Sequence, residues 1–133
     1  MEFLRINHDN IEDLEKFISR IGNSSETFRY YNQRNPRDVV ENHMITFLLY
    51  DNGPVGYGHL DKEENNVWLG ICIKDDKTGN GYGNIMMEKL VNYYNGKINL
   101  SVDYQNERAI NLYKKFSFVE YKKVNGMIFM TRE

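Results

Sequence analysis

Cysteine, proline and long apolar runs are scarce in this sequence, which has one cysteine and two prolines among its 133 residues. A lone cysteine cannot form a disulfide within the chain, so we expect a reducing compartment, the cytoplasm, and no disulfide framework. The N-terminus shows no signal-peptide pattern, and no apolar run approaches the roughly 20 residues of a membrane span. Secretion and membrane insertion are therefore not expected.

An excess of charge of one sign is also lacking. The chain has 17 basic and 19 acidic residues, a net charge of −2 and no basic block, so no nucleic-acid partner is expected. The three histidines and Cys72 show no metal-ligand spacing, so no metal site is expected either. Apolar residues at 41% and charged residues at 27% are typical of a soluble globular protein. We expect one domain over residues 1–133, as a monomer or a homodimer.

The strongest signal is a glycine-rich segment at residues 78–83, Thr-Gly-Asn-Gly-Tyr-Gly. It follows an apolar run at residues 67–73 and opens a helical pattern at residues 84–91. Glycines let the backbone bend and approach a ligand closely, and the first turn of a helix has unpaired N–H groups at a partly positive end. A strand, a glycine loop and a helix in this order predict an anion site, whose usual guest is a phosphate or pyrophosphate.

Two familiar phosphate loops fit this segment poorly. The Walker pattern requires Lys and then Ser or Thr after the loop, and this pair does not follow here. The dinucleotide fingerprint begins well with Gly79 and Gly81, but its third glycine would fall on Asn84. Asp103 has the spacing of a ribose-binding acid, yet no repeated strand–helix–strand units surround it. A glycine-rich turn that binds nothing is the other alternative.

The rest of the chain alternates short strand patterns with amphipathic helix patterns. Asp9 and Glu12 predict a capping box for the first helix, and Gly22 predicts its end. An antiparallel meander of three strands is followed by one strand–helix–strand crossover, whose two strands should be parallel. The expected strands are 3–7, 44–50, 55–61, 67–73, 97–102, 118–124 and 127–131, and the expected helices are 9–21, 37–42, 84–94 and 106–116.

This order of elements, with two motifs, resembles the GNAT superfamily of acetyl-CoA-dependent N-acetyltransferases. Residues 71–83, ICIKDDKTGNGYG, are similar to the family's pyrophosphate loop, although Thr78 stands where the family often has Arg or Gln. Residues 106–118, NERAINLYKKFSF, are similar to its N-x-x-A-x-x-L-Y-x-K-x-G-F segment, with Ser117 at the usual glycine. The resemblance implies an α/β (α+β) fold. Its mixed, mostly antiparallel central sheet has about six to seven strands, with helices on both faces and one parallel crossover.

The resemblance also implies acetyl-CoA as co-substrate. The strand before the loop would present its backbone to the pantetheine arm, and Asn106 would hydrogen-bond that arm. For Cys72 the alternative is a buried small hydrophobe, and for Asn111 it is plain surface solvation. The expected acetyl-CoA contacts are Ile71, Cys72, Ile73, Thr78, Gly79, Asn80, Gly81, Tyr82, Gly83, Asn84, Asn106 and Asn111.

Tyr113 lies in the second motif and is the expected general acid, because a phenol is uncharged at pH 7 and can protonate a departing thiolate. Its periodicity alone would place it in the core. The base is less defined: two positions that carry Glu in some family members are Ser101 and Val67 here. His59 is one candidate, since an ordinary histidine titrates near neutral pH. Asp61 and solvent water are the others.

The acceptor site is expected near residues 23–35, where aromatic residues and arginines are mixed. Phe28, Tyr30 and Tyr31 could stack on a sugar or a flat ring, and Arg29 could pair with a phosphate or carboxylate. A loop pinned by its aromatic residues is the alternative. The expected function is acetyl transfer to a primary amine of a small molecule, such as an amino-sugar or nucleotide-linked amino-sugar. A protein or peptide acetyltransferase and a non-catalytic acyl-CoA-binding module are the alternatives.

Overall fold

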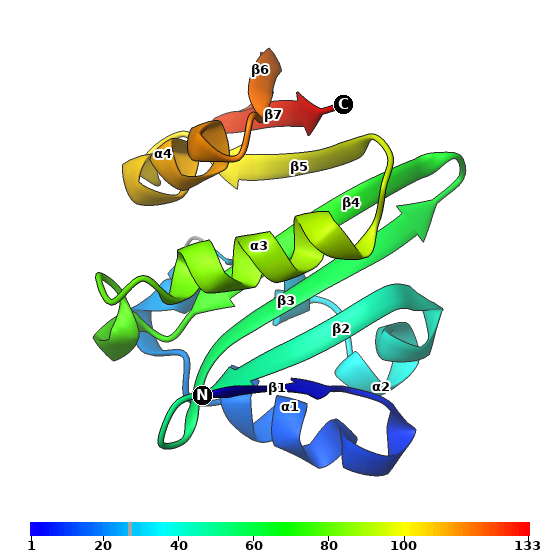
Figure 1. Cartoon of the computed structure of the whole chain (residues 1–133), viewed down its shortest axis with the longest axis vertical. Helices are drawn as coiled ribbons and strands as arrows, with labels where there is room; N and C mark the ends of the chain where they lie inside the picture. The colour runs from blue at the N-terminus through cyan, green and yellow to red at the C-terminus, as the bar shows by residue number, and fades with distance from the viewer. Residues whose placement is uncertain (27) are drawn as a thin grey trace.

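The computed structural model describes residues 1–26 and 28–133 and contains a seven-stranded sheet of order β1-β2-β3-β4-β5-β7-β6 (Figure 1). Neighbouring strands are antiparallel except β4 and β5, which are parallel. The expected mixed sheet with one parallel pair is thus confirmed. The strands are β1 (Glu2–Arg5), β2 (His43–Tyr50), β3 (Pro54–Glu63), β4 (Asn66–Ile73), β5 (Ile98–Asp103), β6 (Val119–Val124) and β7 (Met127–Arg132).

The first helix is shorter than the sequence predicts. The capping box belongs to Asn7 and not to Asp9: the Asn7 side chain caps a short 3-10 turn before the helix, in a reciprocal pair with Asn10. Asn10 is the N-cap of the helix itself. The helix ends at Ile18, before the expected stop at Gly22, whose φ of +65° belongs to the next turn. The helices are α1 (Ile11–Ile18), α2 (Pro36–Val39), α3 (Tyr82–Tyr93) and α4 (Glu107–Lys115), with 3-10 turns η1 (His8–Asn10), η2 (Gly22–Glu26), η3 (Tyr30–Asn32), η4 (Val40–Asn42) and η5 (Asp75–Lys77).

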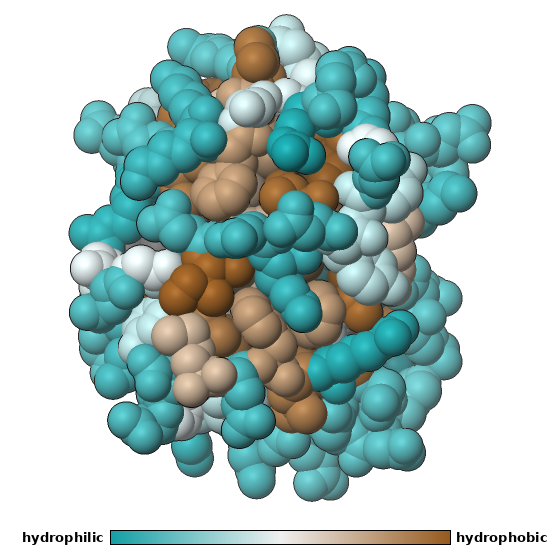
Figure 2. Space-filling view, in the orientation of Figure 1, coloured by the Kyte–Doolittle hydropathy of each residue, from teal (hydrophilic) through white to brown (hydrophobic). Residues whose placement is uncertain are grey.

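The two faces of the sheet carry separate apolar clusters, because successive side chains of a strand point to opposite faces. On β2, Leu48 packs with α1 and Leu49 packs with α3. Helices α3 and α4 cover the same face of the sheet, and α1 covers the other (Figure 1). On the face in view, hydrophobic residues gather in the middle and hydrophilic residues surround them (Figure 2). The ammonium of Lys89 on α3 lies 5.0 Å from the ring centre of Phe3 there.

Strands β4 and β5 form the weakest joint of the sheet. Among the described strands, β3 and β4 pair along eight positions, whereas β4 and β5 pair only at Trp68 and Asn99. The half of β4 that leads to Ile73 therefore has no strand partner on its β5 side. Unpaired backbone groups require another partner, and a ligand can supply it. The candidate site lies at this gap in the strand pairing.

Candidate active site

A cavity of about 1050 Å³ opens at this joint between β4 and β5. Its lining comes from the end of β4, the glycine loop, α4 and the segment before α2. Most of the expected site residues line it, but Asn80 and Tyr31 do not. Those in the lining are Phe28, Arg29, Tyr30, His59, Asp61, Ile71, Cys72, Ile73, Thr78, Gly79, Gly81, Tyr82, Gly83, Asn84, Asn106, Asn111 and Tyr113.

The glycine loop has the backbone that an anion site requires. Gly79 and Gly81 have φ of +83° and +84°, a region that residues with a Cβ rarely adopt. Gly81 is the N-cap of α3, and no atom of the described residues lies within 4 Å of the position a Cβ would take there. The space beside the start of α3 is therefore open at this residue. Asn80 supports this loop from outside the cavity by donating to the carbonyl of Lys77 at 3.0 Å.

Gly83 has a different reason to be glycine. A Cβ at this position would lie 2.9 Å from Cδ2 of Leu112 on α4, so the missing side chain lets α3 and α4 approach closely. Its place in the motif therefore reflects helix packing, although it also lines the cavity.

Cations surround the loop. Lys77, Arg108 and Lys115 line the cavity, and the Arg108 guanidinium lies 3.8 Å from the Cβ position of Gly79. Sequence reasoning missed these residues because the chain has no basic block. The signal was nevertheless present, since Arg108 and Lys115 belong to the second motif. Together with the positive end of α3, they favour a ligand with several negative charges.

Asn106 starts α4. Its Oδ1 accepts from the N–H of Ala109 at 3.2 Å, so the amide oxygen is committed to capping the helix. Its Nδ2 makes no hydrogen bond within the described ranges and is available as a donor to a ligand. Asn111, one helical turn further on, is exposed at the rim of the same cavity.

The Tyr113 hydroxyl faces the cavity although the residue is only 5% exposed. Every fully buried side-chain nitrogen or oxygen of the described residues has a hydrogen-bond partner. The Tyr113 hydroxyl has none among them, so it lies at the cavity surface. Burial, and secondarily nearby Cys72, raises the pKa of Tyr113 above its ordinary range, so the phenol stays protonated at neutral pH. It is available as a proton donor.

His59 is buried in the cavity wall at 2% exposure. Its Nδ1 lies 2.6 Å from the Tyr57 hydroxyl, and its Nε2 has no partner among the residues that the structure describes. By the same reasoning, Nε2 lies at the cavity surface. Burial, followed by the charges of His43 and Arg34, lowers the pKa of His59 well below 6.5. A titration of His59 near neutral pH, expected from the sequence, is therefore not a property of this site.

Asp61 sits beside Trp68, its register partner on β4, and lines the cavity. Burial and the charge of Glu63 raise the pKa of the Asp61 carboxyl. Arg34 and Glu63 line the same region, and the Arg34 guanidinium lies 4.3 Å from the ring centre of Tyr30.

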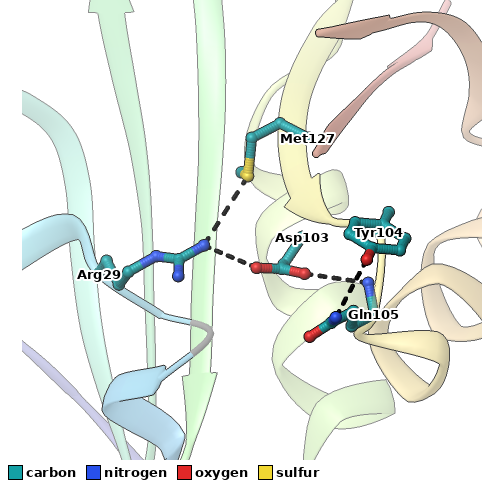
Figure 3. A network of polar contacts seen from close by, with 5 residues as sticks. All are labelled: Arg29, Asp103, Tyr104, Gln105 and Met127. Atoms are coloured by element: carbon teal, nitrogen blue, oxygen red, sulfur yellow. Dashed lines mark hydrogen bonds and ion pairs between the residues drawn. The ribbon is translucent and has the colours of Figure 1, made fainter. Parts of the chain in front are cut away.

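The aromatic segment divides between wall and core. Tyr30 lines the cavity and its hydroxyl lies 2.7 Å from Nε2 of His43. Phe28 and Tyr31 pack against the apolar cluster on the α1 side, which also includes Tyr57. Arg29 is exposed but paired: its guanidinium donates to Asp103 at 2.7 Å (Figure 3).

The sequence matches the model of a known protein family. The model of the acetyltransferase (GNAT) family matches residues 8–118. The chain belongs to this GNAT family. Comparison with curated proteins gives no significant match.

Solved GNAT structures share the fold at low sequence identity. A GNAT-family acetyltransferase from Streptococcus pneumoniae superposes with a TM-score of 0.74 and 21% identity, covering 98% of this chain and 99% of that chain. A putative acetyltransferase from Salmonella typhimurium, solved with its cofactor acetyl-CoA, gives 0.76 and 13%, covering 100% and 93%. A ribosomal-protein-alanine N-acetyltransferase from Brucella melitensis gives 0.77 and 13%, covering 99% of each.

None of the chain's described helices is long and apolar enough to cross a membrane. No three His, Cys, Asp or Glu side chains gather as a metal site among the described residues.

Proposed function

We propose that this GNAT protein transfers an acetyl group from acetyl-CoA directly to a primary amine of a small molecule. One observation carries the proposal: a single cavity is lined by the glycine loop, the Tyr113 hydroxyl, Nε2 of His59 and the side chains of Tyr30 and Asp61. It joins an anion site, a proton donor, a proton acceptor and room for a second molecule.

The residues of the loop fit acetyl-CoA. The open backbone at Gly79 and Gly81 suits a pyrophosphate, and Lys77 and Arg108 supply matching charge. The unpaired edge of β4, at Ile71 and beyond, suits an amide-bearing chain such as the pantetheine arm. When bound, acetyl-CoA supplies the thioester whose acetyl group is transferred.

The side chains then manage two protons. The bound ammonium first loses one proton, which leaves a neutral amine. As the amine nitrogen bonds to the acetyl carbon, Tyr113 gives its hydroxyl proton to the sulfur that leaves, and the second N–H proton restores the Tyr113 hydroxyl. We assign the ammonium proton to His59 first, because Nε2 is unpartnered within the described residues and lies at the cavity surface. Asp61, with its raised pKa, and water are the competing acceptors.

The acceptor region favours a small, polar, cationic amine. Asp61 and Glu63 attract the ammonium form, and Tyr30 and Trp68 offer ring faces to a sugar or flat group. Arg29 already pairs with Asp103, so an acceptor phosphate gains little from it. Amino-sugars without a nucleotide are therefore the first choice. We place the reaction in the cytoplasm, since the chain has no disulfide.

An amine panel with acetyl-CoA tests the function by measuring the release of free thiol. The panel contains amino-sugars, aliphatic amines, aromatic amines and short peptides with free N-termini. The lone cysteine, Cys72, is buried and gives little background with a thiol reagent. Release with a small amine is the expected result. Thiol release with peptides alone would reassign the acceptor. Tight acetyl-CoA binding with no thiol release in the presence of any amine would favour a binding module.

A further inference from the structure

Three side chains form a continuous hydrogen-bonded chain behind the cavity wall. The hydroxyls of Tyr31 and Tyr57 lie 2.6 Å apart, and the Tyr57 hydroxyl lies 2.6 Å from Nδ1 of His59. Tyr57 and His59 are 1% and 2% exposed, whereas Tyr31, in η3, is partly exposed. Burying such groups is costly unless they are bonded to one another, so the chain is a specific arrangement.

The number of protons allows two states of these Tyr31–Tyr57–His59 hydrogen bonds. A hydroxyl has one proton, and a neutral imidazole has one N–H. In the first state, Nδ1–H of His59 donates to Tyr57 and Tyr57 donates to Tyr31, so Nε2 carries a lone pair. In the second state, Tyr31 donates to Tyr57 and Tyr57 donates to Nδ1, so Nε2 carries the proton. Only the first state leaves Nε2 able to accept a proton.

The rings around His59 hold it in place without competing for its nitrogens. His43 stacks on it at 4.3 Å between ring centres, and Tyr30 lies 4.5 Å away. Both nitrogens of His43 are already bonded, to the hydroxyls of Tyr30 and Thr46. A Cβ at Gly70 would lie 2.5 Å from the His59 ring, so glycine on β4 makes room for this orientation. The charges that act on the ring are those of His43 and, secondarily, Arg34.

We propose that Tyr57 and Tyr31 are positioning residues that hold His59 with its proton on Nδ1 and carry a proton away from the acceptor amine. This inference rests on the proposed function. An N–H bond of the bound ammonium breaks and an Nε2–H bond forms, which leaves a neutral amine. The Nδ1 proton passes to Tyr57, the Tyr57 proton passes to Tyr31, and Tyr31 releases a proton to solvent. No long-lived imidazolium forms, and this avoids a charge that burial at His59 would disfavour.

The first test reads the protonated nitrogen of His59 directly by long-range ¹H–¹⁵N spectra of the unliganded protein, and it needs no activity. Wild type is expected to carry the proton on Nδ1. Tyr31→Phe removes the acceptor of the Tyr57 hydroxyl, which should then donate to Nδ1 and move the His59 proton to Nε2. Tyr50 is a partly buried tyrosine of the same apolar cluster whose hydroxyl has no partner among the described residues. Tyr50→Phe is therefore the matched control and should leave Nδ1 protonated.

A proton on Nε2 in wild type, or no change in Tyr31→Phe, overturns the proposal even if the protein is an active acetyltransferase. Conversely, wild type that acetylates no amine removes the proposed function, while the spectra still decide the state of His59. A variant at the fully buried Tyr57 is at risk of not folding. Tyr31→Phe, at a less buried site, shows which His59 nitrogen carries the proton without it.

The second test is kinetic. With a small amine, Tyr57→Phe should lower kcat about 10²-fold, near the lower end of what a positioned acid or base contributes. The loss should shrink as pH rises past the pKa of the acceptor amine, because a neutral amine needs the relay less. Tyr50→Phe should match wild type at every pH. A loss in Tyr57→Phe that stays constant with pH would mean that the hydroxyl serves packing alone, and would overturn the relay.

Discussion

The guanidinium of Arg29 and the carboxylate of Asp103 lie 2.7 Å apart and tie together two parts of the chain that flank the gap between β4 and β5. Arg29 precedes η3, on the acceptor side, and Asp103 ends β5 (Figure 3). The other oxygen of Asp103 accepts from the N–H of Gln105 at 2.9 Å, and the same guanidinium nitrogen lies 4.0 Å from the sulfur of Met127. The Gln105 N–H, and after it the Arg29 guanidinium, lower the pKa of Asp103, so the pair is charged at neutral pH.

A double-mutant cycle on this pair should separate a positioning role of Arg29 from direct substrate binding. If Arg29 serves to hold its loop, Arg29→Gln and Asp103→Asn should each raise the acceptor KM by no more than about fivefold. A half-exposed ion pair contributes about 1 kcal/mol at most. The double variant should then be no worse than either single variant.

Steady-state kinetics with one acceptor, at fixed saturating acetyl-CoA, provide the measurement. Added salt should reduce the wild-type advantage, because the Arg29 side chain is 49% exposed. A much larger effect of Arg29→Gln than of Asp103→Asn, with additive losses in the double variant, would show that Arg29 binds the acceptor itself.

Gly81→Ala should weaken acetyl-CoA binding at least about tenfold, the equivalent of one hydrogen bond to a charged group, about 1.5–3 kcal/mol. The added Cβ meets no protein atom, so any block falls on the ligand. Gly53→Ala is the matched control: Gly53 also has positive φ and open space, but it lies in the turn between β2 and β3. Each variant should lose about 1 kcal/mol of stability to backbone strain. Titration calorimetry that finds equal affinities would remove the loop from the acetyl-CoA site.

Sequence reasoning succeeded where the determining forces are local. The strand, glycine loop and helix around Gly81 follow from the conformational demands of neighbouring residues, and their positions are confirmed. It failed at Asp9, because Asn7 can also form a capping box and residue spacing alone does not distinguish the two. The early end of α1 was missed as well: Ile21 is buried in the apolar cluster on the α1 side, as its spacing predicts, but it lies outside the helix.

The chemistry of the site depended on contacts that no spacing reveals. Arg29 meets Asp103 from 74 positions away, which changes a free cation into half of an ion pair. His59 looked like an ordinary histidine, but its state is set by Tyr57, His43 and burial. Such long-range effects follow from sheet register and side-chain packing, and they appear only when the strands are placed side by side.

Stability should fall as pH decreases below about 6.5 because of buried histidine. Burial, aided by Arg34, lowers the pKa of His43 from 6.5 to about 4. Below pH 6.5 His43 therefore binds a proton in the unfolded chain, whereas in the folded state it does so only near pH 4. The free energy of unfolding should decline by up to about 1.4 kcal/mol per pH unit from this residue, with a further share from His59.

Urea denaturation of wild type and His43→Gln, between pH 7.5 and 5, measures this slope. The variant loses two hydrogen bonds and should be less stable throughout, but its slope below pH 6.5 should be shallower by the His43 share. Above pH 7 the two slopes should agree, which serves as the internal control. Parallel curves over the whole range would mean that His43 is protonated in the folded protein.

Tyr113→Phe should lower the turnover number about 10²–10⁴-fold while acetyl-CoA affinity stays the same. The variant removes only the hydroxyl, which has no partner among the described residues, so neither a hydrogen bond nor the packing of the ring on Phe118 is lost. Stability should therefore change by only a few tenths of a kcal/mol, as usual for a change that leaves packing intact. Single-turnover measurements isolate the chemical step from product release. Because the phenol supplies the proton for the departing thiolate, acyl donors with a more acidic thiol should need it less, and the defect should shrink with them. A variant that turns over like wild type, with chemistry rate-limiting, would leave Tyr113 as a core residue and return the proton to water.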